Sequence, residues 1–355
     1  MKTSPELNQF AEDVLRGLSS TPKHLSSRYF YDDEGSRLFM EIMKLPEYYL
    51  TRAEMKIFTE QKAAICEAFT PTKLVDADVP SAGGHTFQQV PIDLIELGAG
   101  DGTKTAVLIE HMLSMGADFT YQPIDISREA NDALAARFRS NFPQLRISPH
   151  TGDYFEVLGS LRNTNGRRKV LLFLGSNIGN FLRDNAVAFF RSLRAVMNEN
   201  DRLFIGFDMQ KDPRTIVAAY DDNQGVTAAF NLNLLTRINR ELGGDFDLSK
   251  FSHYAQYRPL ECAARSFLIS REKQTVTINA LDRSFDFEQW EAIFMEISQK
   301  YTSGMIEELA LSSGFEIENE FSNETDFYVD SLWRPAPPSD RRLPGPAQPD
   351  SSSDQ

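Results

Sequence analysis

Residues 93–105 read Asp-Leu-Ile-Glu-Leu-Gly-Ala-Gly-Asp-Gly-Thr-Lys-Thr, an apolar strand pattern followed by closely spaced glycines and then a helical pattern. Gly98, Gly100 and Gly102 carry no Cβ and can adopt positive φ angles, so the backbone here can turn tightly and approach a ligand closely. A strand, a glycine-rich turn and a helix in this order are typical of sites that bind nucleotide-type cofactors. The stretch therefore predicts a cofactor loop within an α/β fold.

Acidic residues at this loop limit which cofactor it can hold. Glu96 and Asp101 would both repel a pyrophosphate, and Thr103 stands where the dinucleotide fingerprint has its third glycine. The spacing of the glycines instead resembles motif I of class I S-adenosylmethionine (SAM) methyltransferases, whose cofactor carries a sulfonium and a ribose but no phosphate. Two alternatives from other classes stay open at this point: a dinucleotide-dependent oxidoreductase and a non-catalytic cofactor-binding protein.

Two further acidic residues follow at the ends of the next expected strands. Asp125 ends an apolar stretch about one βαβ unit after the loop, where a carboxylate can accept both ribose hydroxyls or cap the next helix. Asp153, in the sequence Gly-Asp-Tyr-Phe, follows the third strand and could take the adenine amino group. The predicted cofactor-binding residues are Glu96, Gly98, Gly100, Gly102, Lys104, Asp125, Asp153 and Tyr154.

Composition limits the class of protein and its partners. The 355 residues, 41% of them apolar, are enough for a full core in one large domain or two. A net charge of -14 argues against a nucleic-acid partner, because phosphate backbones are bound by clustered Lys and Arg. The apolar run at residues 170–174 is far too short to span a bilayer, and the N-terminal residues contain no apolar signal region. We therefore expect a cytoplasmic protein with no membrane partner; its oligomeric state stays open, and a monomer is compatible with the sequence.

Potential metal ligands are few and poorly spaced. Cys66 and Cys262 are the two cysteines, and the five histidines show neither an H-x-H nor an H-x-x-x-H pattern. The sequence therefore predicts no metal site.

Strand and helix patterns alternate from about residue 90 to residue 208, which predicts a doubly wound parallel sheet. The alternation then breaks, because residues 211–242 predict a long helical stretch that cannot extend such a sheet directly. A helix at residues 303–313 and paired strands at 315–321 and 327–333 predict the antiparallel end of a methyltransferase sheet. The segment between the two parts is therefore expected to be an insertion.

These patterns divide the chain into three regions. The predicted regions are a discontinuous α+β substrate-binding domain at residues 1–70 and 209–302, a SAM-binding methyltransferase core at residues 71–208 and 303–335, and a disordered tail at residues 336–355. Within the core, residues 72–91 are rich in Pro, Ser and Gly around their centre and predict a surface loop before the first strand.

Six segments outside the cofactor loop carry a more specific pattern. They are Tyr-Phe-Tyr-Asp-Asp-Glu-Gly-Ser at 29–36, Leu-Pro-Glu-Tyr-Tyr-Leu-Thr-Arg-Ala-Glu at 45–54, Leu-Gly-Ser-Asn-Ile-Gly-Asn-Phe at 174–181, Ala-Ala-Tyr-Asp-Asp at 218–222, Ala-Phe-Asn-Leu-Asn-Leu-Leu at 229–235 and Met-Glu-Ile-Ser-Gln-Lys-Tyr at 295–301. Over residues 20–335 the chain resembles the histidine Nα-methyltransferases of the ergothioneine pathway. The resemblance implies a class I methyltransferase fold, SAM as cofactor with S-adenosylhomocysteine as product, and conversion of L-histidine to its trimethylated betaine, hercynine.

The same resemblance implies a set of substrate residues. It places Asn180 and Tyr220 at the substrate carboxylate and Gly175 beside the α-amino group, and it places Tyr48, Glu296 and Ser298 at the imidazole, with Tyr31 lining the pocket. Tyr31, Gly175 and Asn180 are the residues expected to serve the reaction itself. The chemistry fits, because amide and phenol groups donate to a carboxylate, while a carboxylate and a hydroxyl pair with imidazole N–H groups.

One position departs from the family pattern. Ser266 stands where well-known family members carry a methionine against the imidazole. Relatives of this fold methylate other amino acids, including prenylated tryptophan. The alternative prediction is therefore the same methyl transfer to another amino acid or amine, for example an indole amino acid.

Overall fold

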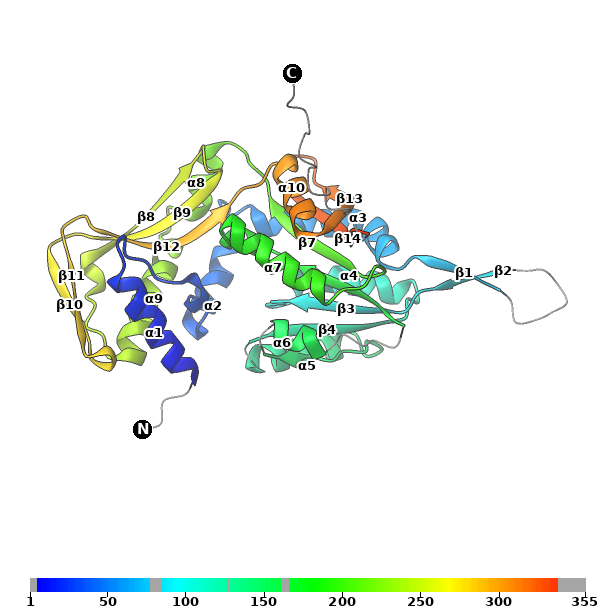
Figure 1. The fold of residues 1–355 in the computed structure, drawn as a ribbon, viewed down its shortest axis with the longest axis horizontal. Coiled ribbons are helices and arrows are strands. Elements are labelled where there is room, and N and C mark those ends of the chain that lie inside the picture. Colours follow the sequence, from blue (N-terminus) through cyan, green and yellow to red (C-terminus); the bar gives the residue numbers. More distant parts are fainter. Residues whose placement is uncertain (1–4, 77–84, 127, 153, 161–165, 338–355) are drawn as a thin grey trace, which may run out of the picture.

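The computed structural model describes residues 5–76, 85–126, 128–152, 154–160 and 166–337, and it shows two units lying side by side (Figure 1). We call them the core unit, which is built on a seven-stranded sheet, and the second unit, which is built on a three-stranded sheet. Asp153 and residues 338–355, which include most of the expected tail, lie outside the described residues.

The core sheet has the strand order β13-β14-β7-β6-β3-β4-β5. Its strands are β3 (Ile92–Leu97), β4 (Phe119–Asp125), β5 (His150–Thr151), β6 (Arg168–Phe173), β7 (Arg202–Asp208), β13 (Phe315–Ser322) and β14 (Tyr328–Pro335). Strands β3 to β7 run parallel, whereas β14 is antiparallel to both of its neighbours. The strand order reverses between β3 and β6, so a crevice for ligands is expected at the carboxyl ends of these strands. The predicted class I methyltransferase sheet and its antiparallel end are confirmed.

Helices bury both faces of this sheet, which explains why its central strands are apolar without alternation. The helices are α3 (Leu50–Phe69), α4 (Thr103–Ser114), α5 (Arg128–Asn141), α6 (Tyr154–Ser160), α7 (Arg183–Ala195) and α10 (Ser303–Ser313). On one face Phe58 and Phe69 of α3 contact Phe204 of β7, and on the other Phe190 of α7 contacts Trp333 of β14. Helix α3 therefore packs on the core sheet, although the expected boundary at residue 70 assigned it to the substrate-binding domain. The division into domains itself stays a prediction.

The second unit combines the N-terminal segment, which precedes the core strands, with the segment inserted between β7 and β13. Its strands are β8 (Phe251–Arg258), β9 (Ala263–Ser270) and β12 (Ala292–Gln299), with a hairpin of β10 (Gln274–Ile278) and β11 (Arg283–Phe287). Its helices are α1 (Pro5–Ser19), α2 (Asp33–Ile42), α8 (Pro213–Tyr220) and α9 (Val226–Leu242). His24 forms a β-bridge with Phe294 of β12, so the N-terminal segment is joined to the inserted one.

Two predicted elements differ from the structure. Residues 211–242 form α8 and α9 rather than one helix, because the Asp222 carboxylate accepts from the backbone N–H groups of Val226 and Thr227 and caps a new helix after Gly225, which has a φ of 74°. The expected loop at residues 72–91 contains an antiparallel hairpin of β1 (Thr72–Asp76) and β2 (His85–Gln89), which projects from the core unit in Figure 1.

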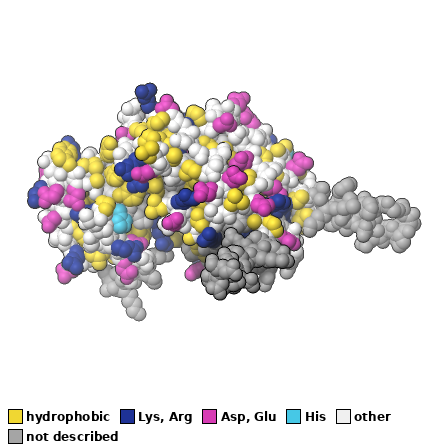
Figure 2. Space-filling model, turned by 45° about the horizontal axis from the view of Figure 1, so that its top comes forward, with side chains coloured by type: hydrophobic (Ala, Val, Ile, Leu, Met, Phe, Trp, Pro, Cys, Tyr) yellow, Lys and Arg dark blue, Asp and Glu magenta, His cyan; other side chains and the backbone are white. Residues whose placement is uncertain are grey.

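Charges of both signs are mixed on the molecular face in Figure 2, where Lys and Arg side chains lie among Asp and Glu. None of the helices in the described residues is both long and apolar enough to cross a bilayer. No group of three His, Cys, Asp or Glu side chains in the described part of the chain is arranged to hold a metal ion.

Substitution of Gly102 tests how tightly the cofactor loop is packed. A Cβ on Gly102 would lie 2.7 Å from Leu134 Cδ1 and 2.9 Å from the Phe138 ring, at a φ of +61°. Gly116, at the other end of α4, has a φ of +68° with no atom within 4 Å of such a Cβ. Gly116→Ala should therefore lower the free energy of unfolding by about 1 kcal/mol through backbone strain, and Gly102→Ala by about 3 kcal/mol through strain and overpacking.

Urea unfolding of the two variants and the wild type measures both changes. Equal destabilisation by the two substitutions would contradict the tight packing of the loop against α5.

Candidate functional site

The cofactor loop turns from β3 into α4 through three glycines with positive φ. Gly98, Gly100 and Gly102 have φ values of 72°, 53° and 61°. Gly98 N donates to Ile124 O at 2.9 Å, which ties the loop to the end of β4. A Cβ on Gly100 would meet no atom within 4 Å, so the space above this part of the loop is open. The loop therefore offers exposed backbone to a ligand at the start of a helix.

The acidic residues of the loop have structural partners. Asp101 accepts from Thr103 N at 3.0 Å and from Thr103 Oγ1 at 2.6 Å, so its side chain closes a turn immediately before α4. Glu96 is buried beneath the loop, where it accepts from Thr105 Oγ1 at 2.8 Å and from the Tyr121 hydroxyl. Burial raises the pKa of Glu96 to about 7. The structure thus places Glu96 under the cofactor loop as a support that joins β3, α4 and β4.

Asp125 and Tyr154 lie next to the same loop. Asp125 is the last residue of β4, the parallel neighbour of β3, and its carbonyl accepts from Gly152 N at 3.1 Å. The Tyr154 hydroxyl lies 2.9 Å from the position that a Cβ on Gly98 would take, so its ring is over the start of the loop. These two predicted residues and the loop glycines are therefore brought together at the carboxyl edge of the sheet.

Glu54 connects the cofactor helix to the substrate side of the site. It is a fully buried side chain of α3 that forms an ion pair with Lys104 of α4. Its Oε1 accepts from Gly175 N at 2.8 Å and from the Tyr328 hydroxyl at 3.0 Å. Sequence reasoning missed this role, and the only signal was the position of Glu54 at the end of the 45–54 segment.

The turn after β6 carries Gly175 and Asn180 toward the second unit. Gly175 and Ser176 have φ values of 75° and 55°, and the short helix η2 (Asn177–Asn180) follows them. In η2, a Cβ on Gly179 would lie 3.1 Å from Gln299 O and 3.4 Å from Ser298 Oγ. The missing Cβ of Gly179 therefore lets η2 pack tightly against β12, and this contact brings Asn180 beside the strand of Ser298.

One cavity at the junction of the two units collects most of the predicted substrate residues. The residues that line it are Tyr31, Phe39, Ile42, Tyr48, Leu50, Gly175, Ser176, Asn177, Asn180, Ala219, Tyr220, Thr227, Phe230, Glu296 and Ser298. Seven of these were predicted from the sequence: Tyr31, Tyr48, Gly175, Asn180, Tyr220, Glu296 and Ser298. They come from the core turn after β6, from the N-terminal segment and from the insertion. Thr227, Phe39 and Phe230 were not foreseen, because their neighbours in the sequence give them ordinary helical patterns.

The walls of the cavity differ in chemistry. Tyr31, Phe39 and Phe230 contact one another through their rings, with centroid separations of 5.4 to 5.9 Å, and form an aromatic wall. Glu296 faces the cavity from β12, and burial raises its pKa to about 7, while the charge of nearby Lys300 opposes this rise. The cavity can therefore accept a flat ring and present one carboxyl group to it.

Ser266 lies beside the cavity rather than in its lining. It is 2% exposed and stands directly opposite Glu296 in the antiparallel ladder of β9 and β12. Residues paired in this way point to the same face of a sheet. A larger side chain at position 266 would therefore reach the neighbourhood of Glu296.

Tyr220 is fixed from two directions at the end of α8. Its hydroxyl lies 2.7 Å from Ser298 Oγ, and His253 Nε2 lies 2.8 Å from its backbone carbonyl. The phenol expected at the substrate carboxylate and the hydroxyl expected at the imidazole are thus direct neighbours.

Comparison with known proteins identifies the family. The model of the family described as histidine-specific, SAM-dependent methyltransferases matches residues 10–335. The chain is 36% identical over 289 residues to a histidine N-alpha-methyltransferase of Mycobacterium tuberculosis, covering 81% of this chain and 83% of the relative. It is 36% identical over 299 residues to the protein of the same description from Mycolicibacterium smegmatis, covering 84% and 86% of the two chains.

A fungal protein is a more distant relative. Ergothioneine biosynthesis protein 1 of Schizosaccharomyces pombe is 28% identical over 305 residues, which span 84% of this chain but only 37% of the fungal protein. The family model covers nearly the whole described chain, from α1 to β14, and so includes both the cofactor loop and the cavity. The chain belongs to the family of SAM-dependent, histidine-specific methyltransferases.

Proposed function

We propose that this enzyme transfers methyl groups to the α-amino group of free L-histidine, giving trimethylhistidine in ergothioneine-type biosynthesis. The observation that carries the proposal is the cavity beside Gly175, which is lined by Asn180, Tyr220, Glu296 and Ser298. These groups match the two polar ends of histidine, because amide and hydroxyl groups can bind a carboxylate and a carboxyl group can bind a ring N–H.

The cofactor side of the proposal rests on the loop of β3 and α4. SAM, when bound, supplies the methyl group as an electrophilic sulfonium substituent. Gly98, Gly100 and Gly102 would lie against it with bare backbone, and the Asp125 carboxylate would accept from the ribose hydroxyls. Lys104 and Glu54 link this loop to Gly175, so the two binding regions have a fixed separation.

Catalysis would then depend mainly on positioning and on exclusion of water. Methyl transfer is an in-line displacement, which needs a neutral amine held close to the methyl carbon. Asn180 and Tyr220 would fix the α-carbon through the carboxylate, and the bare backbone at Gly175 would leave room for the amine to turn between successive transfers. A strong base is not required, since a nearby positive sulfonium disfavours the ammonium form of the substrate.

Asp125→Ala tests the cofactor site. Loss of a pair of charge-assisted hydrogen bonds should weaken binding of S-adenosylhomocysteine by about 10-fold or more, measured by calorimetry. Asp132→Ala, which removes an exposed carboxylate from the neighbouring helix α5, is the matched control and should leave the affinity unchanged. Equal affinities in all three proteins would remove Asp125 from the site.

Glu296→Gln tests the imidazole side through the pH dependence of stability. The pKa of Glu296 is about 7 in the folded protein against 4.5 ordinarily, so ionisation of this group opposes folding. The ligand-free Gln variant should become more stable than the wild type as pH rises from about 4.5 to 7, reaching a difference on the order of 3 kcal/mol above pH 7. Thermal unfolding at pH 5 and pH 8 measures the change.

At pH 8, bound histidine should make the wild type more stable than Glu296→Gln, because the ring N–H of histidine would stabilise the Glu296 carboxylate. The increase in unfolding temperature caused by histidine should therefore be larger for the wild type than for Glu296→Gln. Equal increases in both proteins would place the imidazole elsewhere.

Ser266→Met tests the departure from the family pattern. The larger side chain should fill space next to Glu296 and raise the ratio of kcat/KM for histidine to that for tryptophan by about 5-fold or more, since one well-packed group is worth 1–3 kcal/mol. This ratio is measured for the wild type and for Ser266→Met by mass spectrometry of the methylated products. Wild-type protein that methylates tryptophan faster than histidine would support the alternative substrate and overturn the histidine proposal.

A further inference from the structure

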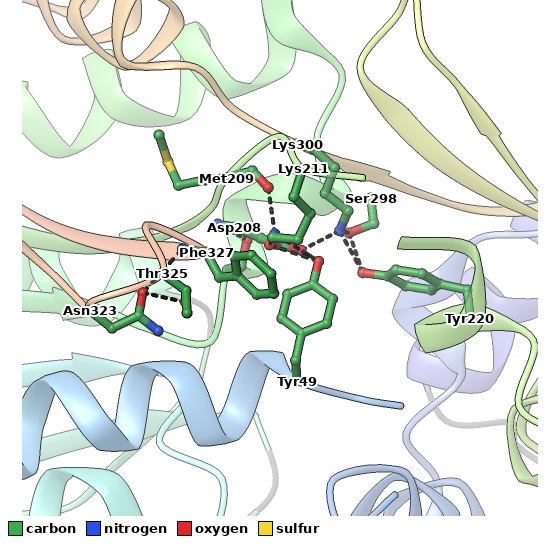
Figure 3. A network of polar contacts seen from close by, with 11 residues as sticks. Tyr49, Asp208, Met209, Lys211, Tyr220, Ser298, Lys300, Asn323, Thr325 and Phe327 are labelled. Carbon is green, nitrogen blue, oxygen red and sulfur yellow. Dashed lines mark hydrogen bonds and ion pairs between the residues drawn. The ribbon is translucent and has the colours of Figure 1, made fainter. Parts of the chain in front are cut away.

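A cluster of buried charges lies directly behind the polar end of the cavity (Figure 3). We call Tyr49, Asp208, Lys211 and Lys300 the junction cluster, since they come from the start of α3, the end of β7, the segment after β7 and the residue after β12. Asp208 and Lys300 are fully buried, and the Lys211 side chain is only 4% exposed. The cofactor and substrate residues discussed above do not include any member of this cluster.

The junction cluster contains more positive than negative charge. Asp208 pairs with both Lys211 and Lys300, and Tyr49 donates to the same carboxylate at 2.9 and 3.0 Å. Within the described chain, neither lysine forms an ion pair with a second carboxylate. Two ammonium groups therefore share one carboxylate in a region from which water is largely excluded, and this arrangement favours an anion nearby.

Lys300 is the member of the cluster that contacts residues of the cavity lining. Its Nζ lies 2.7 Å from Asp208 Oδ2, 2.7 Å from the Tyr220 hydroxyl and 2.7 Å from Ser298 Oγ. An ammonium group has three protons and no acceptor, so these three contacts use all of its donors. The oxygens of Tyr220 and Ser298 must both accept from Lys300.

This requirement sets the direction of both hydroxyl groups. Because each oxygen uses one of its two lone pairs to accept from Lys300, the O–H protons of Tyr220 and Ser298 point away from Lys300, either to each other or into the cavity. Lys211 has no such effect, because its contacts are Asp208, the Tyr49 hydroxyl and the Met209 carbonyl. The two buried lysines therefore differ in function although they share one carboxylate.

We propose that Lys300 is a positioning residue that turns the O–H protons of Tyr220 and Ser298 away from itself, toward each other and the cavity, and thereby makes the cavity select substrates with a free carboxylate. The proposal rests on the proposed function, in which these two hydroxyls contact the amino acid. An amide or an amine without a carboxylate lacks the negative charge that the buried ammonium favours. Discrimination between an α-carboxylate and an α-carboxamide is therefore assigned to Lys300 acting through Tyr220, the hydroxyl expected at the substrate carboxylate.

The experiment measures the Kd of L-histidine and of L-histidinamide by calorimetry, with S-adenosylhomocysteine present, for the wild type, Lys300→Met and Lys211→Met. The wild type should prefer histidine by about 10-fold or more, as charge-assisted hydrogen bonds predict. Lys300→Met should reduce this ratio at least 5-fold, mainly by weakening histidine. Lys211→Met should keep the ratio within about twofold, and the Kd of S-adenosylhomocysteine should stay within threefold in both variants.

An unchanged ratio in Lys300→Met, or an equal fall in Lys211→Met, would overturn the proposal. Equal loss of affinity for histidine and S-adenosylhomocysteine would also overturn it, because that result indicates a purely structural role. Should Lys300→Met fail to fold by circular dichroism, Lys300→Gln gives the same test with a neutral donor in place of the ammonium. Absence of histidine binding to the wild type contradicts the proposed function itself, and the two failures are thereby distinguished.

Discussion

Asp208, at the carboxyl end of β7, places a fully buried carboxylate where the two units meet, and groups from three other segments bond to it. A buried carboxylate without partners is strongly unfavourable, so Tyr49, Lys211 and Lys300 must all be brought to this point when the chain folds. Since Lys300 follows β12 and Tyr49 precedes α3, the Asp208 carboxylate joins segments of both units at the cavity. The approach of η2 to β12 and the bridge between Met209 and Tyr301 join the units at the same place.

Glu54 has a comparable role on the cofactor side. Its carboxylate joins Lys104, Gly175 and Tyr328, which belong to α4, to the turn after β6 and to β14. The cofactor helix and the turn that carries Asn180 are therefore connected through the buried Glu54 carboxylate. For a methyl transfer, whose rate depends on the alignment of two bound molecules, such a fixed separation is worth more than an additional contact to either molecule.

The polar groups of the cavity divide into donors and one acceptor. Tyr220 and Ser298 both accept from Lys300, which turns their O–H protons away from it, whereas Glu296 carries a carboxyl group whose pKa of about 7 is close to that of an imidazole. Phe39 and Phe230 supply apolar surface between these groups. The arrangement favours a small zwitterion with a ring that can both donate and accept hydrogen bonds.

The sequence by itself determined the features that depend on local pattern. Gly98, Gly100 and Gly102 permit the positive φ angles of the cofactor loop. The alternation of apolar strands and helices predicts the parallel sheet. Both features are properties of consecutive residues. Seven cavity residues were also found, since they lie in short segments that resemble a known family. The tertiary structure alone decided the partners of Glu54, the packing of α3 on the core sheet, the pairing of Ser266 with Glu296 and the contact of Lys300 with Tyr220 and Ser298. Most of these contacts join residues that are far apart in the chain, and they form because buried charges and apolar faces must find partners wherever the fold brings them together.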